Sequence, residues 1–204
     1  MRRLLAVSAL SLLAMGLTSP LAAQRRDRGL VELAPSAVRG GFYLAGGIGA
    51  GRESYKFSDE NAYSDALTKP TLLLRLGGTP DPYVRVGGEV FAWRAKGSDG
   101  DETFTTLMGT VQFYPLRDGG LFIKAGGGWA ESAIDFFNGA RTSETGFGWS
   151  VGAGYEIQLS GNLAIGPSVE LYQGSFSRRD EATLNERVLN IGGQITFQTG
   201  GRRR

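Results

Sequence analysis

Apolar and polar residues alternate one by one over long parts of this chain, which is the period of a β-strand and not of a helix. In the clearest stretch, from Phe147 to Leu159, every second residue is apolar and the residues between them are small or polar. Similar stretches recur along the sequence. Together they predict eight strands, near residues 42–50, 72–77, 83–93, 105–114, 121–129, 147–159, 163–172 and 189–197.

The connections between these strands alternate between short and long. Short turns are expected at residues 79–82, 115–120 and 160–162, and long polar connections at residues 52–69, 95–102, 131–144 and 174–186. Pro, Gly, Asn and Asp mark both kinds of connection, as turn geometry requires. This order places every short turn at one end of a meander and every long loop at the other, which is typical of membrane-spanning barrels.

The polar face of the strands indicates which side meets lipid. Gly148, Gly152 and Gly154 occupy it in the clearest strand, where a water-facing surface would carry many Lys and Glu residues. Small residues with a few charges suit the narrow lumen of an eight-stranded barrel, and the apolar face suits lipid. The sequence therefore predicts an all-β fold, an eight-stranded antiparallel up-and-down transmembrane β-barrel. The open alternative is a soluble lipocalin-like carrier, which turns its apolar face inward.

Charged residues on the inward face are the candidate functional residues. Their positive and negative charges balance, and buried charges persist when they are paired and hydrogen-bonded. Because the second and sixth strands face each other across an eight-stranded ring, Arg75 is expected to meet Glu156. We predict that the set plugs the lumen, and the alternative is a narrow pore lined by the same residues. The set comprises Arg75, Arg85, Glu89, Lys124, Glu156 and Glu170, with the amides Gln112, Gln158, Asn190 and Gln194.

The composition removes most catalytic chemistries. The 204 residues include 32 glycines but no Cys and no His. Disulfides, thiol nucleophiles, His-containing triads and His-ligated metals are therefore excluded. The sequence predicts a protein that is not an enzyme and that has no catalytic, cofactor-binding or metal-binding residues.

The first residues have the three-part pattern of a secretory signal peptide. Arg2 and Arg3 precede an apolar stretch of fourteen residues, which is shorter than the about 20 residues of a membrane-spanning helix. Cleavage is expected after Ala23, and the mature chain then has 20 Lys and Arg against 20 Asp and Glu. Such a neutral chain gives no electrostatic reason to bind nucleic acid. The predicted parts are a signal peptide (1–23), a short periplasmic leader (24–40), a barrel (41–198) and a basic tail (199–204).

Four features carry a resemblance to a known family. They are the signal peptide, the opening Gly41 to Gly47, the turn-and-strand run Tyr114 to Lys124, and the last strand with its aromatic end at Phe197. Together they resemble the eight-stranded outer-membrane β-barrel family of OmpA-, OmpX- and OmpW-like proteins, over about residues 40 to 198. The resemblance implies a monomer in the outer membrane of a Gram-negative cell, surrounded by lipid and lipopolysaccharide.

The resemblance also implies a route of assembly and a function. The last strand resembles the signal read by the barrel-assembly machinery, through Asn190, Gly192, Ile195 and Phe197. Barrel enzymes of the family largely depend on histidine, so the expected function is non-enzymatic. We expect an integral membrane protein with a structural or surface-interaction role through four long extracellular loops. The alternatives are a small channel for small or hydrophobic solutes and the secreted lipocalin-like carrier.

Overall fold

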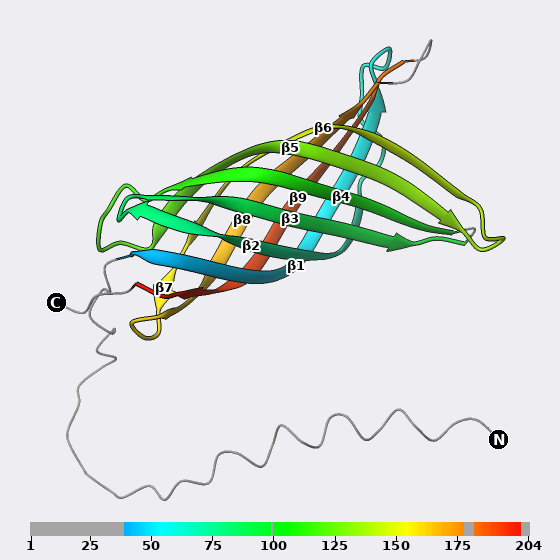
Figure 1. The fold of residues 1–204 in the computed structure, drawn as a ribbon. Helices are drawn as coiled ribbons and strands as arrows, with labels where there is room; N and C mark the ends of the chain where they lie inside the picture. The colour runs from blue at the N-terminus through cyan, green and yellow to red at the C-terminus, as the bar shows by residue number, and fades with distance from the viewer. Residues whose placement is uncertain (1–38, 99, 178–181, 201–204) are drawn as a thin grey trace, which may run out of the picture. The chain divides into compact units, whose positions relative to one another are not determined.

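The computed structural model describes residues 39–98, 100–177 and 182–200 (Figure 1). The predicted signal peptide, nearly all of the predicted leader and most of the predicted tail lie outside these ranges, so the cleavage after Ala23 stays a prediction. In the described ranges, no helix is both long and apolar enough to cross a membrane.

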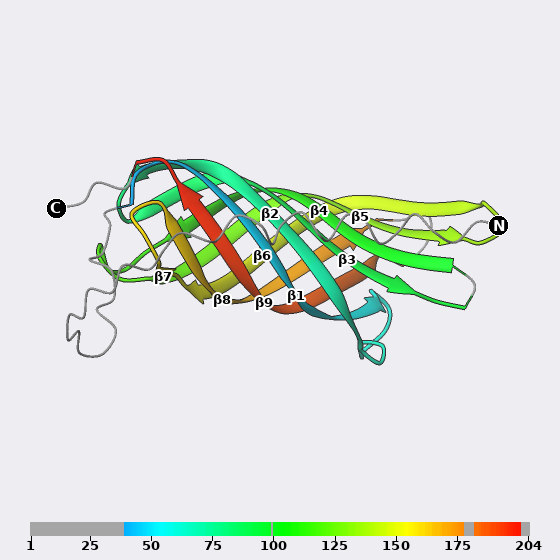
Figure 2. The same ribbon diagram turned by 90° about the horizontal axis from the view of Figure 1, so that it is seen from below.

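The described residues form strands that pair in one closed antiparallel sheet. Strands that follow each other along the chain pair, except that β6 and β7 both pair with β8, and β1 pairs with β9 to close the barrel (Figures 1 and 2). The predicted all-β, eight-stranded barrel is thereby confirmed. Its strands are β1 (Gly41–Phe57), β2 (Leu67–Asp81), β3 (Val84–Lys96), β4 (Gly100–Phe113), β5 (Leu121–Phe136), β6 (Arg141–Tyr155), β7 (Ile157–Gln158), β8 (Leu163–Phe176) and β9 (Leu184–Gln198).

β6 and β7 are two parts of one barrel strand, interrupted at Glu156. Both pair with β8, and the pairs Gly154–Ser168 and Ile157–Ile165 keep the same register across the gap. β8 carries Pro167 between these two pairs, and proline has no N–H to donate to a sheet. The Glu156 N–H instead donates to the Gly120 carbonyl, at 2.8 Å.

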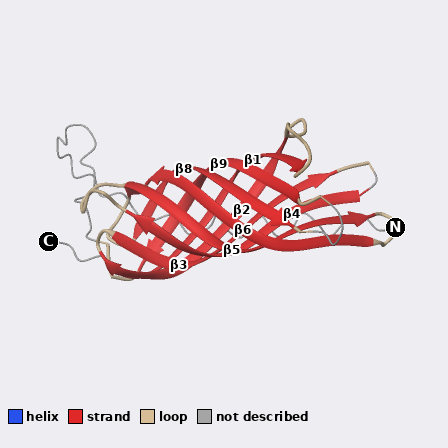
Figure 3. Cartoon of the chain, turned by 90° about the horizontal axis from the view of Figure 1, so that it is seen from above, coloured by secondary structure: helices blue, strands red, loops and turns tan. Residues whose placement is uncertain are grey.

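The strands extend much further than the alternation predicts at the end of the barrel with the long connections. Between β1 and β2 the connection covers residues 58–66 rather than 52–69, and between β5 and β6 it covers residues 137–140 rather than 131–144. The prediction of four long loops is therefore wrong in extent, because polar strands continue to pair in water where apolar alternation has ended. Figure 3 shows the paired strands with short tips at this end, which we call the long-hairpin end.

The outward side chains of the barrel are apolar. Ile48 is 71% exposed, Leu72 64% and Ile191 60%. This outward apolar belt contradicts the soluble, lipocalin-like alternative, whose apolar side chains would face inward. Towards the long-hairpin end, the apolar belt ends at an edge where charged residues begin on the outward face. We take the strand segments between this edge and the short turns as the membrane-spanning part. The residues that mark the edge are Arg52, Arg94, Glu131 and Arg187.

Candidate functional site in the barrel lumen

Four predicted lumen residues form a central ion cluster. Arg75 on β2 and Lys124 on β5 each contact both Glu89 on β3 and Glu170 on β8. The Lys124 Nζ lies 2.7 Å from a Glu89 carboxylate oxygen and 2.6 Å from a Glu170 oxygen. All four side chains are fully buried. Two cations and two carboxylates therefore neutralise each other in the middle of the lumen.

The strand register brings these side chains together. Arg75 lies directly opposite Glu89 in the β2–β3 pair. Gly152 lies between Lys124 and Glu170, since it pairs with Lys124 on one side and with Glu170 on the other. A Cβ atom on Gly152 would lie 2.7 Å from the Glu170 Cγ, so a side chain there would occupy space that Glu170 needs.

Neutral side chains complete the hydrogen bonding of the central cluster. The Arg75 guanidinium donates to the Gln194 side-chain oxygen at 2.7 Å. The Tyr172 hydroxyl donates to Glu170 at 2.5 Å and accepts from Lys124 at 3.1 Å. Buried ions are stable only when such additional bonds satisfy their remaining donors and acceptors. The alternation predicts Gln194 among the inward polar residues. Nothing in the sequence predicts that the Tyr172 hydroxyl bonds to Glu170 and Lys124.

A second ion cluster lies nearer to the short turns. The Arg85 guanidinium donates to Glu156 at 2.7 Å, to the Tyr114 hydroxyl at 2.6 Å and to the Gln198 side chain at 2.9 Å. Tyr114 follows the last residue of β4, and burial, together with the nearby Glu156 carboxylate, raises its pKa. The hydroxyl therefore stays protonated as a neutral partner of the ion pair.

The expected contact between Arg75 and Glu156 is wrong. Arg75 pairs with Glu89 and Glu170, while Glu156 accepts from Arg85. Barrel strands tilt and are staggered against one another, so residues on opposite strands need not lie at the same height. The two ends of the expected pair consequently belong to different clusters along the barrel axis.

Arg39 closes the second cluster from outside the strands and was not predicted. Its guanidinium carbon lies 3.7 Å from the centre of the Tyr114 ring, and its Nη1 donates to the Arg117 carbonyl at 3.1 Å. A Glu156 carboxylate oxygen lies 3.9 Å from its Nε. Burial lowers the pKa of Arg39 from its ordinary value, against the opposing attraction of Tyr114 and Glu156. Because Arg39 precedes the first strand, the alternation carries no information about it.

An apolar layer fills the lumen on the other side of the central cluster. The rings of Phe91 and Tyr172 stack with centroids 3.7 Å apart. The Trp93 indole N–H donates to the Gly51 carbonyl at 2.9 Å, so this buried ring also has its polar atom satisfied. The other large members of the layer are Leu73, Phe104, Met108, Phe176 and Val188.

The remaining predicted residues lie in different surroundings. Gln112 and Asn190 are buried, and the Asn190 side-chain oxygen accepts from the Thr71 hydroxyl at 2.6 Å. Gln158 instead donates to the Ser160 carbonyl in a short turn, outside both ion clusters. Of the residues assigned to the assembly signal, Ile195 and Phe197 point outward and are exposed. Gly192 lies between them and Asn190 on β9.

Comparisons with known proteins agree with the architecture. The model of a family described as "Outer membrane protein beta-barrel domain" matches residues 9–197. No curated protein matches the chain. Among solved structures, surface protein A (NspA) of Neisseria is similar with a TM-score of 0.55 and 11% identity, covering 78% of this chain and 97% of that one. Ail, the attachment invasion locus protein of Yersinia pestis, gives a TM-score of 0.48 at 16% identity, covering 76% and 99%.

Proposed function

Because this chain belongs to the outer membrane β-barrel family, we propose that it is a non-enzymatic integral membrane protein with a sealed lumen and a structural or surface-contact role. The observation that carries the proposal is the pair of neutral ion clusters in the lumen. Arg75, Glu89, Lys124 and Glu170 form one, and Arg85 and Glu156 form the other.

Both clusters support a plug rather than a pore. The lumen of an eight-stranded barrel is just wide enough to be filled by side chains. A passing ion would have to displace Lys124 or Arg75 from two carboxylates each, in surroundings where an unpaired buried charge is costly. The apolar layer around Phe91 and Trp93 adds a second barrier, because it offers a hydrated ion few polar partners.

The side chains in the lumen also support a non-enzymatic role. The ammonium group of Lys124 is fully buried and is held by two carboxylates and a tyrosine hydroxyl, so a substrate has no open approach to it. The full chain contains no His or Cys that would serve as another nucleophile or general base.

The long-hairpin end supports a surface-contact role. It is the extracellular end in barrels with short periplasmic turns, and the strands remain paired past the charged edge of the apolar belt. At the belt edge, Lys69, Arg94 and Lys96 line a groove whose other lining residues include Ile48 and Leu72. Cations above an apolar surface suit the phosphates and acyl chains of lipopolysaccharide, which we propose as the neighbouring lipid.

The last strand supports the proposed assembly route. Ile195 and Phe197 present their side chains outward near the end of β9, where an assembly factor would reach them. Asn190 has a hydrogen bond inside the barrel, so its part in the signal rests on the family resemblance alone. We propose that the folded chain works as a monomer, since its barrel closes within one chain.

Solute uptake into proteoliposomes tests the sealed lumen. Vesicles that contain the folded protein are diluted into isotonic arabinose, and swelling is followed by light scattering. We expect vesicles with the folded barrel to swell no faster than protein-free vesicles at every protein-to-lipid ratio. Parallel vesicles that contain a general porin are expected to swell rapidly. A rate that rises in proportion to the amount of folded barrel would favour the small-channel alternative instead.

A further inference from the structure

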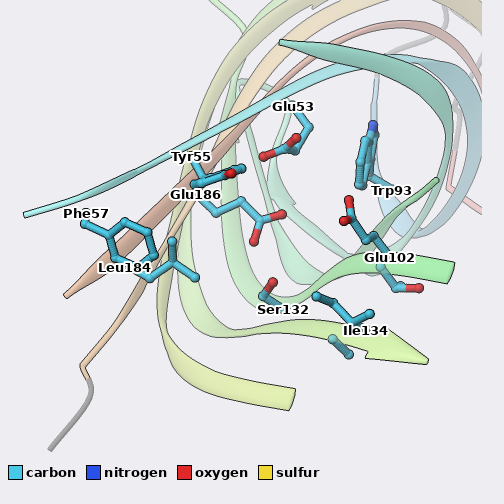
Figure 4. Close-up of a pocket in the computed structure, with 11 residues that line it drawn as sticks. Glu53, Tyr55, Phe57, Trp93, Glu102, Ser132, Ile134, Leu184 and Glu186 are labelled. Atoms are coloured by element: carbon cyan, nitrogen blue, oxygen red, sulfur yellow. The ribbon is translucent and has the colours of Figure 1, made fainter. Parts of the chain in front are cut away.

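A pocket opens at the long-hairpin end, beyond the apolar layer of the lumen. It has a volume of about 260 Å³ and is lined by residues from β1, β3, β4, β5 and β9. Figure 4 shows the carboxyl groups of Glu53, Glu102 and Glu186 turned towards this space, with Trp93 at its edge. The pocket therefore combines negative charge with apolar walls.

Glu53 is a largely buried residue whose carboxyl group has no partner among the described residues. Glu53 is only 6% exposed, and within the described part of the chain no hydrogen bond or ion pair engages its carboxyl group. Glu186 is also 6% exposed, and Ser132 lines the same pocket. A buried carboxylate is normally paired, because leaving it unpaired costs free energy. The two side chains thus have unused capacity to bind a positive charge.

The walls of the pocket favour an apolar body next to that charge. Trp93, Tyr55 and Phe57 contribute aromatic rings, and Leu184 and Ile134 contribute aliphatic groups. Aromatic faces attract organic cations, most strongly when the site is shielded from water. An engineered apolar cavity of about 150 Å³ is large enough for benzene. A pocket of about 260 Å³ therefore holds a small ring together with an ammonium group.

We propose that this pocket binds a small organic cation, an ammonium group on an apolar body, with Glu53 and Glu186 as its counter-charges. A metal ion fits less well, because the described carboxyl groups do not form a set of three placed around a single ion. A neutral apolar ligand would give the two carboxyl groups no counter-charge when they are ionised. The site lies beyond the sealed layers of the lumen, so its occupancy does not depend on whether the lumen conducts.

The protonation of these groups supports the proposal and gives it a pH dependence. Both lie beyond the charged edge of the apolar belt, outside the membrane-spanning part. Burial, with the Glu102 carboxylate, raises the pKa of Glu53 to about 7. Burial, with Glu53, Glu102 and Glu144, raises the pKa of Glu186 to about 8, against the opposing effect of the Ser132 hydroxyl. A bound cation favours the ionised carboxylates, so its affinity rises as the pH rises through 7 and 8.

Calorimetric titration of the folded protein in dodecyl maltoside micelles tests the site. Benzyltrimethylammonium is the probe, because its charge does not change with pH, and empty micelles correct for partitioning. We expect one saturable site per barrel, with at least tenfold tighter binding at pH 9 than at pH 6. Tetramethylammonium lacks the ring and benzyl alcohol lacks the charge, so each is expected to bind at least tenfold more weakly.

Two variants separate the pocket from general surface charge. The double variant Glu53→Gln/Glu186→Gln is expected to lose at least tenfold in affinity and to lose its pH dependence. Glu131→Gln is the matched control, since this carboxylate lies on the outer face of β5 and is paired with Arg141. It is expected to keep the wild-type affinity within twofold. The heat-dependent gel mobility of each variant shows that its barrel is folded.

Three results would overturn the proposal: no saturable binding, benzyl alcohol binding as tightly as the cation, or unchanged affinity in the folded double variant. A further arm uses N-acetyl-lysine amide, whose ammonium group represents a protein side chain. Its binding is expected to be weaker than that of benzyltrimethylammonium. Tighter binding would overturn the assignment to a free small cation and would assign the site to a side chain of a protein partner.

Discussion

Lys124→Met is expected to lower the free energy of unfolding by about 3–5 kcal/mol, the usual cost of removing one partner from a buried ion pair. Lys124 contacts both Glu89 and Glu170, so its loss leaves two buried carboxylates facing the single charge of Arg75. The central cluster then carries a net negative charge in surroundings that exclude water. Urea unfolding of the protein in lipid vesicles, followed by tryptophan fluorescence, measures the difference.

Two further variants show whether the loss comes from the unbalanced charge. Lys124→Met/Glu89→Gln restores neutrality, because Arg75 and Glu170 remain as a pair, and we expect it to recover most of the lost stability. Arg94→Met breaks the exposed ion pair with Asp101 and is expected to cost less than about 1 kcal/mol. Equal losses in Lys124→Met and Arg94→Met would contradict a balanced, water-excluded cluster.

Ile48→Arg is expected to lower the free energy of unfolding by about 2–4 kcal/mol in vesicles, the cost of an arginine on the lipid face near the bilayer midplane. Ile48 is 71% exposed and lies in the middle of the part of β1 between Phe42 and the charged edge at Arg52. In a water-soluble barrel, the same exposed position would tolerate arginine. The substitution therefore measures the solvent that the outer face meets.

An exposed position beyond the belt provides the control for this substitution. Ser143 lies on the outward side of β6, near the tip of the β5–β6 hairpin. Ser143→Arg is expected to change the stability by no more than about 0.5 kcal/mol, as most exposed substitutions do. If Ile48→Arg were as neutral as Ser143→Arg, the apolar belt would not be the face that contacts lipid.

The strand number and the identity of the two faces followed from the sequence because both depend on a strictly local property. Successive side chains point to opposite faces in every strand, so the apolar residues Phe147, Val151 and Ile157 lie on one face whatever their partners are. Glycines on the polar face of the strands indicate a narrow lumen, since a face exposed to water would carry long polar side chains at these positions. For the same reason Arg75 and Glu170 could be placed inside before their partners were known.

The pairing of the inward charges could not be predicted because it depends on register and stagger. Alternation fixes which face a residue is on, but not its height along the barrel axis relative to a distant strand. Strand order alone therefore pairs Arg75 with Glu156, whereas its partners in the barrel are Glu89 and Glu170. Arg39 was missed for a different reason, since it reaches Glu156 from a segment that precedes β1.

Alternation also could not predict the ends of the strands or the pocket at the long-hairpin end. Past the belt edge, both strand faces meet water or polar neighbours, so the apolar period disappears while backbone pairing continues. Glu53 and Glu186 consequently fell within predicted polar connections, although they lie within β1 and β9 and line one pocket. Their proximity requires the closure of the barrel between its first and last strands.

Single-channel recording in planar lipid bilayers tests the sealed lumen most directly. Insertion is verified in the same lipid by the heat-dependent gel mobility of the reconstituted protein, and a general porin shows that the bilayer reports open channels. A lumen filled by Arg75, Glu89, Lys124 and Glu170 predicts no steady unitary currents from the wild-type protein. Large and steady unitary currents from the verified, folded barrel would contradict the plug and identify the protein as a channel.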